Sequence, residues 1–277
     1  MAAALFCFAA LDTSAKKAGQ TLPPLQIAWV RFAGAAAIIY AAAATGGNWT
    51  VWKTRRPGLN ALRSLLLLGS TVFNFIALRK LQLAQTMTIA FLSPMLVALG
   101  AGPLLGEWVG WRRLAAIAVG FSGVVVAMGV GAGDFEPAML LSIGSTACFA
   151  GYSLLTRMIA GEDSTMTSLL WSTLGGTVAL APALPWIWKT PPTLASFDVM
   201  WFPAILAAIG HWLMIRAHER APASKIAPLV YTELLWMAIN GWVVFGDVPP
   251  TRVYVGAAIV VAAGLYLIHR ERVRVVP

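Results

Sequence analysis

The chain has 277 residues, of which 59% are hydrophobic and 11% are charged. A soluble domain usually carries about 25% charged residues, so this composition excludes an ordinary soluble protein and places most of the surface in lipid. The net charge is +9, but the basic residues lie mostly between apolar segments, where such residues set membrane topology. Nucleic acid is therefore not an expected partner.

Ten successive segments are long and apolar enough to cross a bilayer, which takes about 20 residues of helix. The connections between them are short, with proline and glycine at the turns, and none could hold a soluble domain. Backbone polar groups must pair internally in lipid, so the sequence predicts an all-α integral membrane protein with ten transmembrane helices. The predicted helices cover residues 2–18, 25–44, 62–81, 86–105, 113–131, 138–159, 166–188, 200–217, 224–245 and 253–268.

Lysine and arginine in the loops predict the orientation of the chain in the membrane. If the N-terminus is cytoplasmic, the inner face receives thirteen of these residues and the outer face receives six. The remaining one, Arg31, lies inside the second predicted helix. This excess on one side predicts that both termini are cytoplasmic.

Two stretches of the sequence, residues 84–107 and 223–247, share one arrangement. Each is a long apolar run that ends in an acid preceded by a glycine. Aligning the two acids places Ser93-Pro94 opposite Glu233-Leu234, so each run has a polar or helix-disturbing pair near its middle. A fixed internal period of this kind predicts that the chain consists of two related halves.

The first helix of each predicted half supports the same period. Cys7-Phe8-Ala9 recurs as Cys148-Phe149-Ala150, and this match places Lys16 opposite Arg157. Five helices per half is an odd number, so the second half starts on the opposite side of the membrane and is inverted. Inverted halves are typical of transporters with a substrate site near the midplane, although a duplicated scaffold without a transport role is the alternative. The predicted halves are residues 1–134 and 135–277.

These residues resemble the drug/metabolite transporter superfamily, in its ten-helix EamA-type branch. Residues 24–32 look like the second-helix motif of that branch, and Ser93-Pro94 with Leu105-Gly106-Glu107 looks like the fourth-helix motif. In the second half, residues 221–224 and Glu233 match. The chain departs from the family pattern in three places: Leu234 stands for proline, Asp247 stands for glutamate, and the seventh helix has no arginine matching Arg31.

Within that branch, the chain looks most like bacterial inner-membrane exporters of amino acids of the YddG type. The resemblance implies a multi-pass protein of the inner membrane that exports amino acids, including aromatic ones, by alternating access through a wide apolar cavity. A carrier of another small metabolite and a passive channel or facilitator are the alternatives. A carrier would saturate and show counterflow, and a channel would not.

Glu233 is the most informative single residue. It follows Ser224 by nine residues, about 13 Å of helix, which places it near the middle of a hydrocarbon core about 30 Å thick. A carboxylate at that depth is costly unless it faces the interior, is paired or is protonated. We therefore expect a proton or substrate-amine site there, with a packing role as the alternative.

Three other charged residues inside predicted helices bear on the site. Asp12 and Lys16 are four residues apart on one helix and could pair near the outer surface, or Asp12 could recognise a zwitterion. Arg31 lies one-third of the way into its helix, a position more typical of a snorkelling or packing residue than of a ligand.

The predicted cavity is formed by helices one, three and four and their counterparts six, eight and nine. Aromatic side chains there could stack on a substrate, and His211 could titrate near neutral pH or be a hydrogen-bonded core residue. The expected substrate-binding residues are Asp12, Phe73, Asn74, Ser93, Pro94, Tyr152, His211, Trp212, Tyr231, Glu233 and Trp236.

The sequence has none of the motifs of an intramembrane enzyme. There is no His-Glu-x-x-His, no Gly-x-Ser-x-Gly and no phosphate-binding loop, so we expect no enzyme activity, no metal and no cofactor. The expected partners are a small-molecule substrate and the lipid bilayer, and proton coupling stays open. Glycines at 120, 123, 256 and 264 could pack within the subunit or form a dimer, so the sequence leaves a monomer and a homodimer open.

Overall fold

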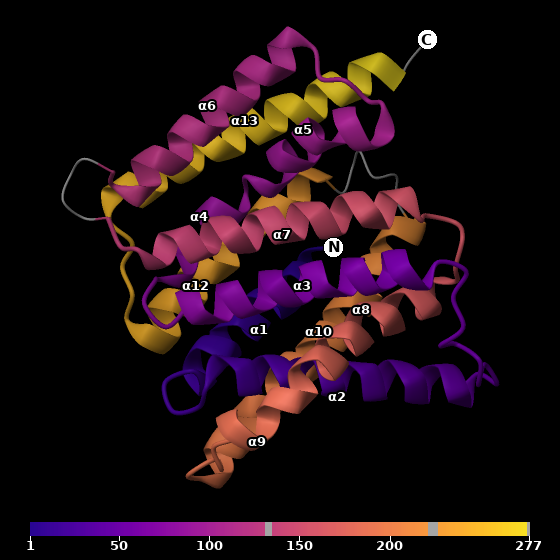
Figure 1. Ribbon diagram of the computed structural model, residues 1–277. Helices are drawn as coiled ribbons and strands as arrows, with labels where there is room; N and C mark the ends of the chain where they lie inside the picture. The colour runs from indigo at the N-terminus through magenta and orange to yellow at the C-terminus, as the bar shows by residue number, and fades with distance from the viewer. Residues whose placement is uncertain (131–134, 221–226, 276–277) are drawn as a thin grey trace.

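The computed structural model describes residues 1–130, 135–220 and 227–275, and these are folded almost entirely as helices (Figure 1). Nine helical stretches among the described residues are long and apolar enough to cross a membrane. The first helix is shorter, with 17 residues, at the lower end of the range that can span a bilayer. The elements are α1 (Ala2–Ala18), α2 (Pro24–Thr45), α3 (Pro57–Ala77), α4 (Leu83–Ala90), α5 (Ser93–Leu105), α6 (Trp111–Met128), α7 (Ala138–Met158), α8 (Thr165–Leu180), η1 (Ala181–Ala183), α9 (Leu184–Ile187), α10 (Leu194–Arg220), η2 (Ala227–Thr232), α12 (Glu233–Phe245) and α13 (Thr251–Val275).

Three segments predicted as single helices are interrupted. The predicted helix 86–105 breaks between α4 and α5, because Pro94 has no N–H to donate and its ring would clash with the carbonyl of Ala90. The predicted helix 166–188 passes through the 3₁₀ turn η1 at Pro182. The predicted helix 224–245 begins outside the described residues, continues as the 3₁₀ segment η2 and becomes α-helical at Glu233.

Three predicted helices had clearly wrong limits, and one of them, predicted at 253–268, is Thr251–Val275. The helix predicted at 62–81 is Pro57–Ala77, because proline at the first helical position is pre-organised for helix and needs no N–H partner there. The helix predicted at 200–217 extends over Leu194–Arg220, since polar residues such as Asp198 continue the helix beyond its apolar part. Apolar length alone therefore misplaced these ends.

The helices pack as one bundle in which distant parts of the chain are neighbours. α1 packs on α10 and α12, α3 packs on α7 and α8, and α2 packs on α8 and α10. α6 and α13 form a separate pair along one side of the bundle (Figure 1). Short connections make successive spans cross the bundle in alternating directions.

These crossings define two opposite faces of the bundle. The Lys16 face carries the ends of α1, α3 and α12 and the start of α2; it is on the left in Figure 1. The Arg157 face carries the ends of α2, α5 and α7 and the start of α8; it is on the right. In the orientation predicted from the loop charges, the Arg157 face is cytoplasmic.

The glycines of α6 and α13 pack within the subunit. A Cβ atom on Gly256 would overlap the carbonyl oxygen of Gly123, and one on Gly123 would lie 2.9 Å from Ile259. The two helix backbones therefore touch, as small residues allow inside a membrane. The sequence allowed these glycines to pack either within the subunit or in a dimer. In the structure Gly123 and Gly256 pack within the subunit.

Replacing Gly256 by leucine is expected to separate α6 from α13. We expect the variant to lose about 1–3 kcal/mol of unfolding free energy, the usual cost of overpacking a close contact. Thermal unfolding of the detergent-solubilised protein measures the change. Ala258→Leu is the matched control, because Ala258 is exposed on the same helix. An equal loss of thermal stability in Gly256→Leu and Ala258→Leu would contradict the close contact between α6 and α13 at Gly256.

Candidate functional site

A cavity of about 480 Å³ lies between α2, α3, α7, α8 and α10. It begins at mid-depth beside Arg31 and extends toward the Arg157 face, where Ala42, Thr165 and Arg216 line it. Among the residues that the structure describes, none that lines the cavity is acidic. Its size falls within the range of pockets that hold drug-sized ligands. The other lining residues are Phe32, Ala35, Ile38, Ile39, Leu67, Tyr152, Met166, Leu169, Ser172, Thr173, Ala207, Ala208, Ile209, His211 and Trp212.

Aromatic side chains form much of the cavity wall, and some are held by contacts outside it. The hydroxyl of Tyr152 lies 3.5 Å from that of Ser172, and the guanidinium of Arg63 lies 5.5 Å from the Tyr152 ring centre. Arg63 is itself buried and donates a hydrogen bond of 2.5 Å to the Ser168 carbonyl. Tyr152 is thus fixed in place and presents a ring on which a planar ligand could stack.

His211 lines the cavity from α10. Its Nδ1 atom lies 2.7 Å from the carbonyl oxygen of Ala207, and its ring meets Phe8 of α1 edge-on with the ring centres 5.1 Å apart. His211 is therefore a hydrogen-bonded, packed residue that also forms part of the cavity wall.

Arg31 is the polar centre at the deep end of the cavity. Its Nη1 atom donates a hydrogen bond to the Thr71 hydroxyl of α3, and its guanidinium lies 5.0 Å from the Phe32 ring centre. Its Nε atom is buried and has no hydrogen-bond partner among the described residues. A buried N–H without a partner is costly, and an acceptor on a bound ligand could satisfy it.

Asp12 lies behind Arg31 and interacts with it electrostatically. The side-chain amide of Asn74 donates to both carboxylate oxygens of Asp12, at 3.2 and 3.1 Å. Glu233 is also close enough to interact with Asp12 electrostatically. Four spans, α1, α2, α3 and α12, thus contribute to a polar network at mid-depth, which we call the Asp12–Arg31 network (Asp12, Arg31, Thr71, Asn74, Glu233).

The family of the protein follows from a comparison with known sequences. The model of the EamA-like transporter family matches residues 1–129 and 136–269. The chain belongs to the EamA-like transporter family. This confirms the family resemblance inferred from the sequence motifs.

Relatives of this EamA-like protein are named as transporters of different small molecules. A riboflavin transporter of Vibrio cholerae is 29% identical and aligns with 90% of this chain and 84% of its own length. An S-adenosylmethionine uptake transporter of Rickettsia bellii is 28% identical over 94% of this chain and 89% of its own. A pseudopaline exporter of Pseudomonas aeruginosa is 23% identical over 97% of this chain and 94% of its own. The chain is therefore a multi-pass membrane protein related to small-metabolite transporters.

A solved crystal structure has the same fold. It is 20% identical to this EamA-like chain, superposes with a TM-score of 0.66, and covers 97% of this chain and 98% of that one. At this identity the similarity shows the fold alone.

The residues expected to bind substrate fall into three groups in this EamA-like structure. Tyr152, His211 and Trp212 line the cavity. Asp12, Asn74 and Glu233 belong to the Asp12–Arg31 network. The other five lie outside the cavity lining: Phe73, Ser93, Pro94, Tyr231 and Trp236.

Three of this last group pack against other helices. Phe73 packs on Gly144 of α7. Tyr231 packs on Phe91 with ring centres 4.9 Å apart. Trp236 meets Phe6 of α1 with ring centres 5.2 Å apart. Ser93 is buried at the start of α5 and Pro94 is exposed there.

The cavity also differs from the expected one in the helices that build it. The sequence predicted the first, fourth and ninth helices among the walls. In the structure the second helix (α2) and the seventh (α8) take their place. Arg31, Phe32 and Ser172 line the cavity but were not among the residues expected to bind substrate. The available signal was Arg31, a charge inside an apolar span, which marks a functional site by default.

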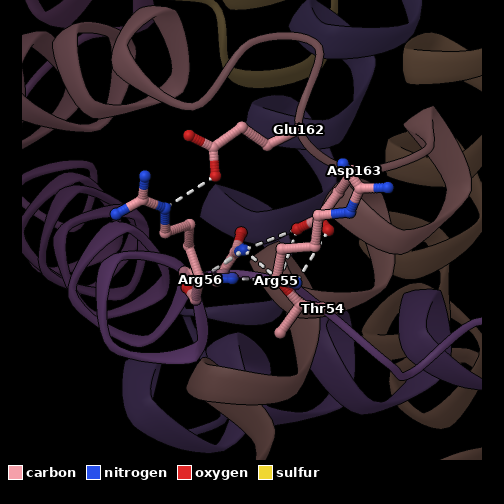
Figure 2. A network of polar contacts seen from close by, with 6 residues as sticks. Thr54, Arg55, Arg56, Glu162 and Asp163 are labelled. Carbon is pink, nitrogen blue, oxygen red and sulfur yellow. Dashed lines mark hydrogen bonds and ion pairs between the residues drawn. The ribbon is translucent and has the colours of Figure 1, made fainter.

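A cluster of polar loop residues joins the α2–α3 and α7–α8 connections (Figure 2). Asp163 accepts hydrogen bonds from the Thr54 hydroxyl, from the Arg55 backbone N–H at 3.0 Å and from the Asn60 side-chain amide at 3.0 Å. Beside it, Arg56 pairs with Glu162 at 2.8 Å (Figure 2). Thr165, which lines the cavity, follows Asp163 by two positions.

The Asp163 carboxylate is stabilised in its charged form by this cluster. Partial burial alone would raise its pKa, but the hydrogen bonds from Thr54, Arg55 and Asn60 and the charge of Arg55 together lower the pKa below its usual range. A lowered pKa stabilises the folded protein above the unfolded-state pKa of about 3.9. That stabilisation disappears as the pH falls through the folded-state pKa.

Replacing Asp163 by asparagine should therefore cost about 1–3 kcal/mol of unfolding free energy at pH 7, because it weakens several hydrogen bonds to a charged group. The difference from the wild type should shrink as the pH is lowered below about 4. Thermal unfolding in detergent between pH 3 and pH 7 measures both effects. Asp198→Asn, at an exposed acid, is the control and should cost little. If Asp163→Asn lowered the stability equally at every pH in this range, the stabilising role of the charged Asp163 carboxylate would be contradicted.

Proposed function

We propose that the protein is a secondary carrier of a small organic metabolite with a planar ring and a group that accepts hydrogen bonds from Arg31. The observation that carries this proposal is the cavity of about 480 Å³, with Tyr152, His211 and Trp212 in its wall and Arg31 at its deep end. Ring stacking would supply affinity, and the guanidinium would orient the ligand.

Riboflavin is the substrate to test first. Its flat ring system carries several carbonyl and nitrogen acceptors, which suit an arginine with an unfilled N–H at the deep end of the cavity. None of the described residues that line the cavity is acidic, which favours a neutral or anionic ligand over the cationic S-adenosylmethionine. An amino acid, the substrate expected from the sequence, would fill only part of a cavity of this volume. The relatives are named as transporters of other molecules.

The inverted-repeat architecture and alternating access belong to the same proposal. The family model matches one stretch in each predicted half. The helix contacts follow the same repeat. The first and eighth helices (α1 and α10) pack together, as their counterparts the sixth and third (α7 and α3) do. The first and ninth helices (α1 and α12) also pack together, as the sixth and fourth (α7 and α5) do. The broken helices begin again at Ser93 and at Glu233, which are the aligned positions of the two halves. Broken helices at a repeat interface are typical of alternating-access transporters.

The proposed location is the bacterial inner membrane, with both termini cytoplasmic. The cavity would then extend toward the cytoplasm. Relatives named for uptake and for export both occur, so the direction of net transport would follow the substrate gradient and any coupled ion.

Transport into liposomes tests the proposal. The purified protein is reconstituted and uptake of labelled riboflavin is measured with and without a pH gradient, with unlabelled riboflavin, S-adenosylmethionine and phenylalanine as competitors. We expect saturable uptake and counterflow, with riboflavin the strongest competitor. Non-saturable flux would indicate a channel, and competition by phenylalanine alone would restore the amino-acid assignment. No flux above that of empty liposomes with any of these would overturn the proposed substrate class.

A further inference from the structure

Lys16 holds three elements together at the Lys16 face. Its ammonium group lies 2.7 Å from the Asp247 carboxylate at the end of α12. It also donates a hydrogen bond of 3.0 Å to the Leu81 carbonyl, between α3 and α4, and lies 4.6 Å from the centre of the Phe245 ring. The side chains of Lys16 and Asp247 are only 13% and 22% exposed, so water screens this pair weakly.

A second ion pair joins the aligned residues at the other face. Lys16 aligns with Arg157 in the sequence, and Asp247 aligns with Glu107. Arg157 donates to both oxygens of Glu107, at 2.9 and 3.0 Å. In each pair, the base ends the first helix of one predicted half and the acid follows the fourth helix of the other half.

The two ion pairs differ in burial. The side chains of Arg157 and Glu107 are 49% and 55% exposed, and no further partner joins them in the part of the chain that the structure describes. Exposed ion pairs contribute little, because solvent screens them and ordering the side chains costs entropy. The partly buried Lys16–Asp247 pair, with the further contacts of Lys16 to Leu81 and Phe245, therefore holds its face more firmly than the exposed pair does.

The cavity lies on the side of the weaker pair. Its lining runs from Arg31 toward the Arg157 face and includes no residue from the Lys16-face ends of α2, α3, α8 or α10. That end is closed by further contacts across the bundle. The buried Gln26 side chain bonds the backbone of Lys189, at 2.8 and 2.9 Å, and the Trp29 indole donates to the Thr177 carbonyl at 3.1 Å.

We propose that Lys16–Asp247 and Arg157–Glu107 are a reciprocal pair of ion-pair gates, one at each face of the carrier. The structure is the state in which the Lys16 gate is fully formed and the cavity is reached from the Arg157 face. In the opposite state, Lys16 and Asp247 separate and the Arg157–Glu107 pair becomes the buried one. This inference rests on the proposed alternating-access function and names the residues that set the balance of its two states.

Distances between spin labels at each face test the gates without a transport assay. Labels at Gln20 and Val248 report on the Lys16 face, and labels at Leu104 and Ala160 report on the Arg157 face; all four residues are exposed. The native Cys7 and Cys148 are replaced by alanine in the background. The protein is measured by double electron–electron resonance in liposomes.

Lys16→Gln and Asp247→Asn are each expected to increase the share of the longer Gln20–Val248 distance about fivefold to tenfold, as the loss of a partly buried ion pair shifts a two-state balance. The exchanged pair Lys16→Asp with Asp247→Lys should return the distribution toward the wild type. Arg157→Gln should shift the balance the other way, with a larger share of the longer Leu104–Ala160 distance and a smaller share of the longer Gln20–Val248 distance. Lys17→Gln is the matched control, an exposed neighbouring lysine that should change neither distance.

Unchanged distances in Lys16→Gln and Asp247→Asn, in protein that stays monodisperse, would overturn the proposal. So would an equal change in Lys17→Gln. If Lys16→Gln does not fold, the exchanged pair Lys16→Asp with Asp247→Lys still tests the proposal, because it keeps an ion pair of reversed polarity. A Gln20–Val248 distance distribution unlike that of the wild type in the folded exchanged pair would then overturn the proposal. The distances report on the gates whether or not riboflavin is transported, so failure of the gates and failure of the proposed substrate are separate results.

Discussion

Replacing Arg31 by glutamine is expected to lower the transport rate about 100-fold at substrate concentrations below saturation. Arg31 lines the deep end of the cavity, and its buried Nε atom has no hydrogen-bond partner among the described residues. A hydrogen bond to a charged group is worth about 1.5–3 kcal/mol, which corresponds to roughly 10- to 150-fold in affinity. Uptake of labelled riboflavin into liposomes, measured over a range of concentrations, gives the change in KM and in maximal rate.

Arg31→Lys is the informative second variant. Lysine keeps the charge but loses the planar fork of donors, so it should recover folding stability better than transport. If Arg31 only packs α2 against α3 through Thr71, both variants should lower thermal stability and leave KM unchanged. A normal KM in well-folded Arg31→Gln protein would remove Arg31 from the proposed site.

The breaks in the fourth and ninth helices show how much the sequence could predict. The pairs Ser93-Pro94 and Glu233-Leu234 were identified as disturbances within apolar runs, and regular α-helix begins at Ser93 and at Glu233. Proline explains the first break directly. The second has no proline at the aligned position, and its 3₁₀ segment contains Pro228 instead, so sequence located the break but not its form.

Lys16 shows where local rules failed. The four-residue spacing to Asp12 suggested a pair within one helix, but Lys16 binds Asp247, 231 residues away. The reason is that α1 and α12 pack side by side and both end at the Lys16 face, where a carboxylate near the membrane surface is a better partner than one buried at mid-depth. Spacing along one helix carries no information about which other helix ends beside it.

The cavity walls could not be predicted from the repeat. The alignment indicated which helices correspond, but the shape of a cavity depends on side-chain volume at each contact. On α2, Ala35 and Ala42 face the cavity beside Phe32, and on α8 Ser172 and Thr173 do so. Small residues at these positions leave room that larger ones at the expected walls fill, as Tyr231 does against Gly264.

Replacing Asp12 by asparagine is expected to lower transport about 30-fold, through its effect on Arg31. Asp12 accepts both hydrogen bonds from Asn74 and is the acidic group that stabilises the buried guanidinium. Its loss leaves Arg31 with an uncompensated charge, which is costly in a membrane interior. Riboflavin uptake by the reconstituted variant measures the effect, and thermal unfolding checks that the variant is folded.

A double-mutant cycle separates this positioning role from direct binding. If Asp12 acts by holding Arg31, then Asp12→Asn in the Arg31→Gln background should cost almost nothing further. Additive losses would instead mean that Asp12 contacts the substrate or a proton independently. Glu233→Gln tests the second carboxylate of the network separately, since Glu233 interacts with Asp12 electrostatically but has no hydrogen bond to it in the structure. Normal transport in both Asp12→Asn and Glu233→Gln would show that neither carboxylate takes part, and the polar centre of the carrier would then be Arg31 alone.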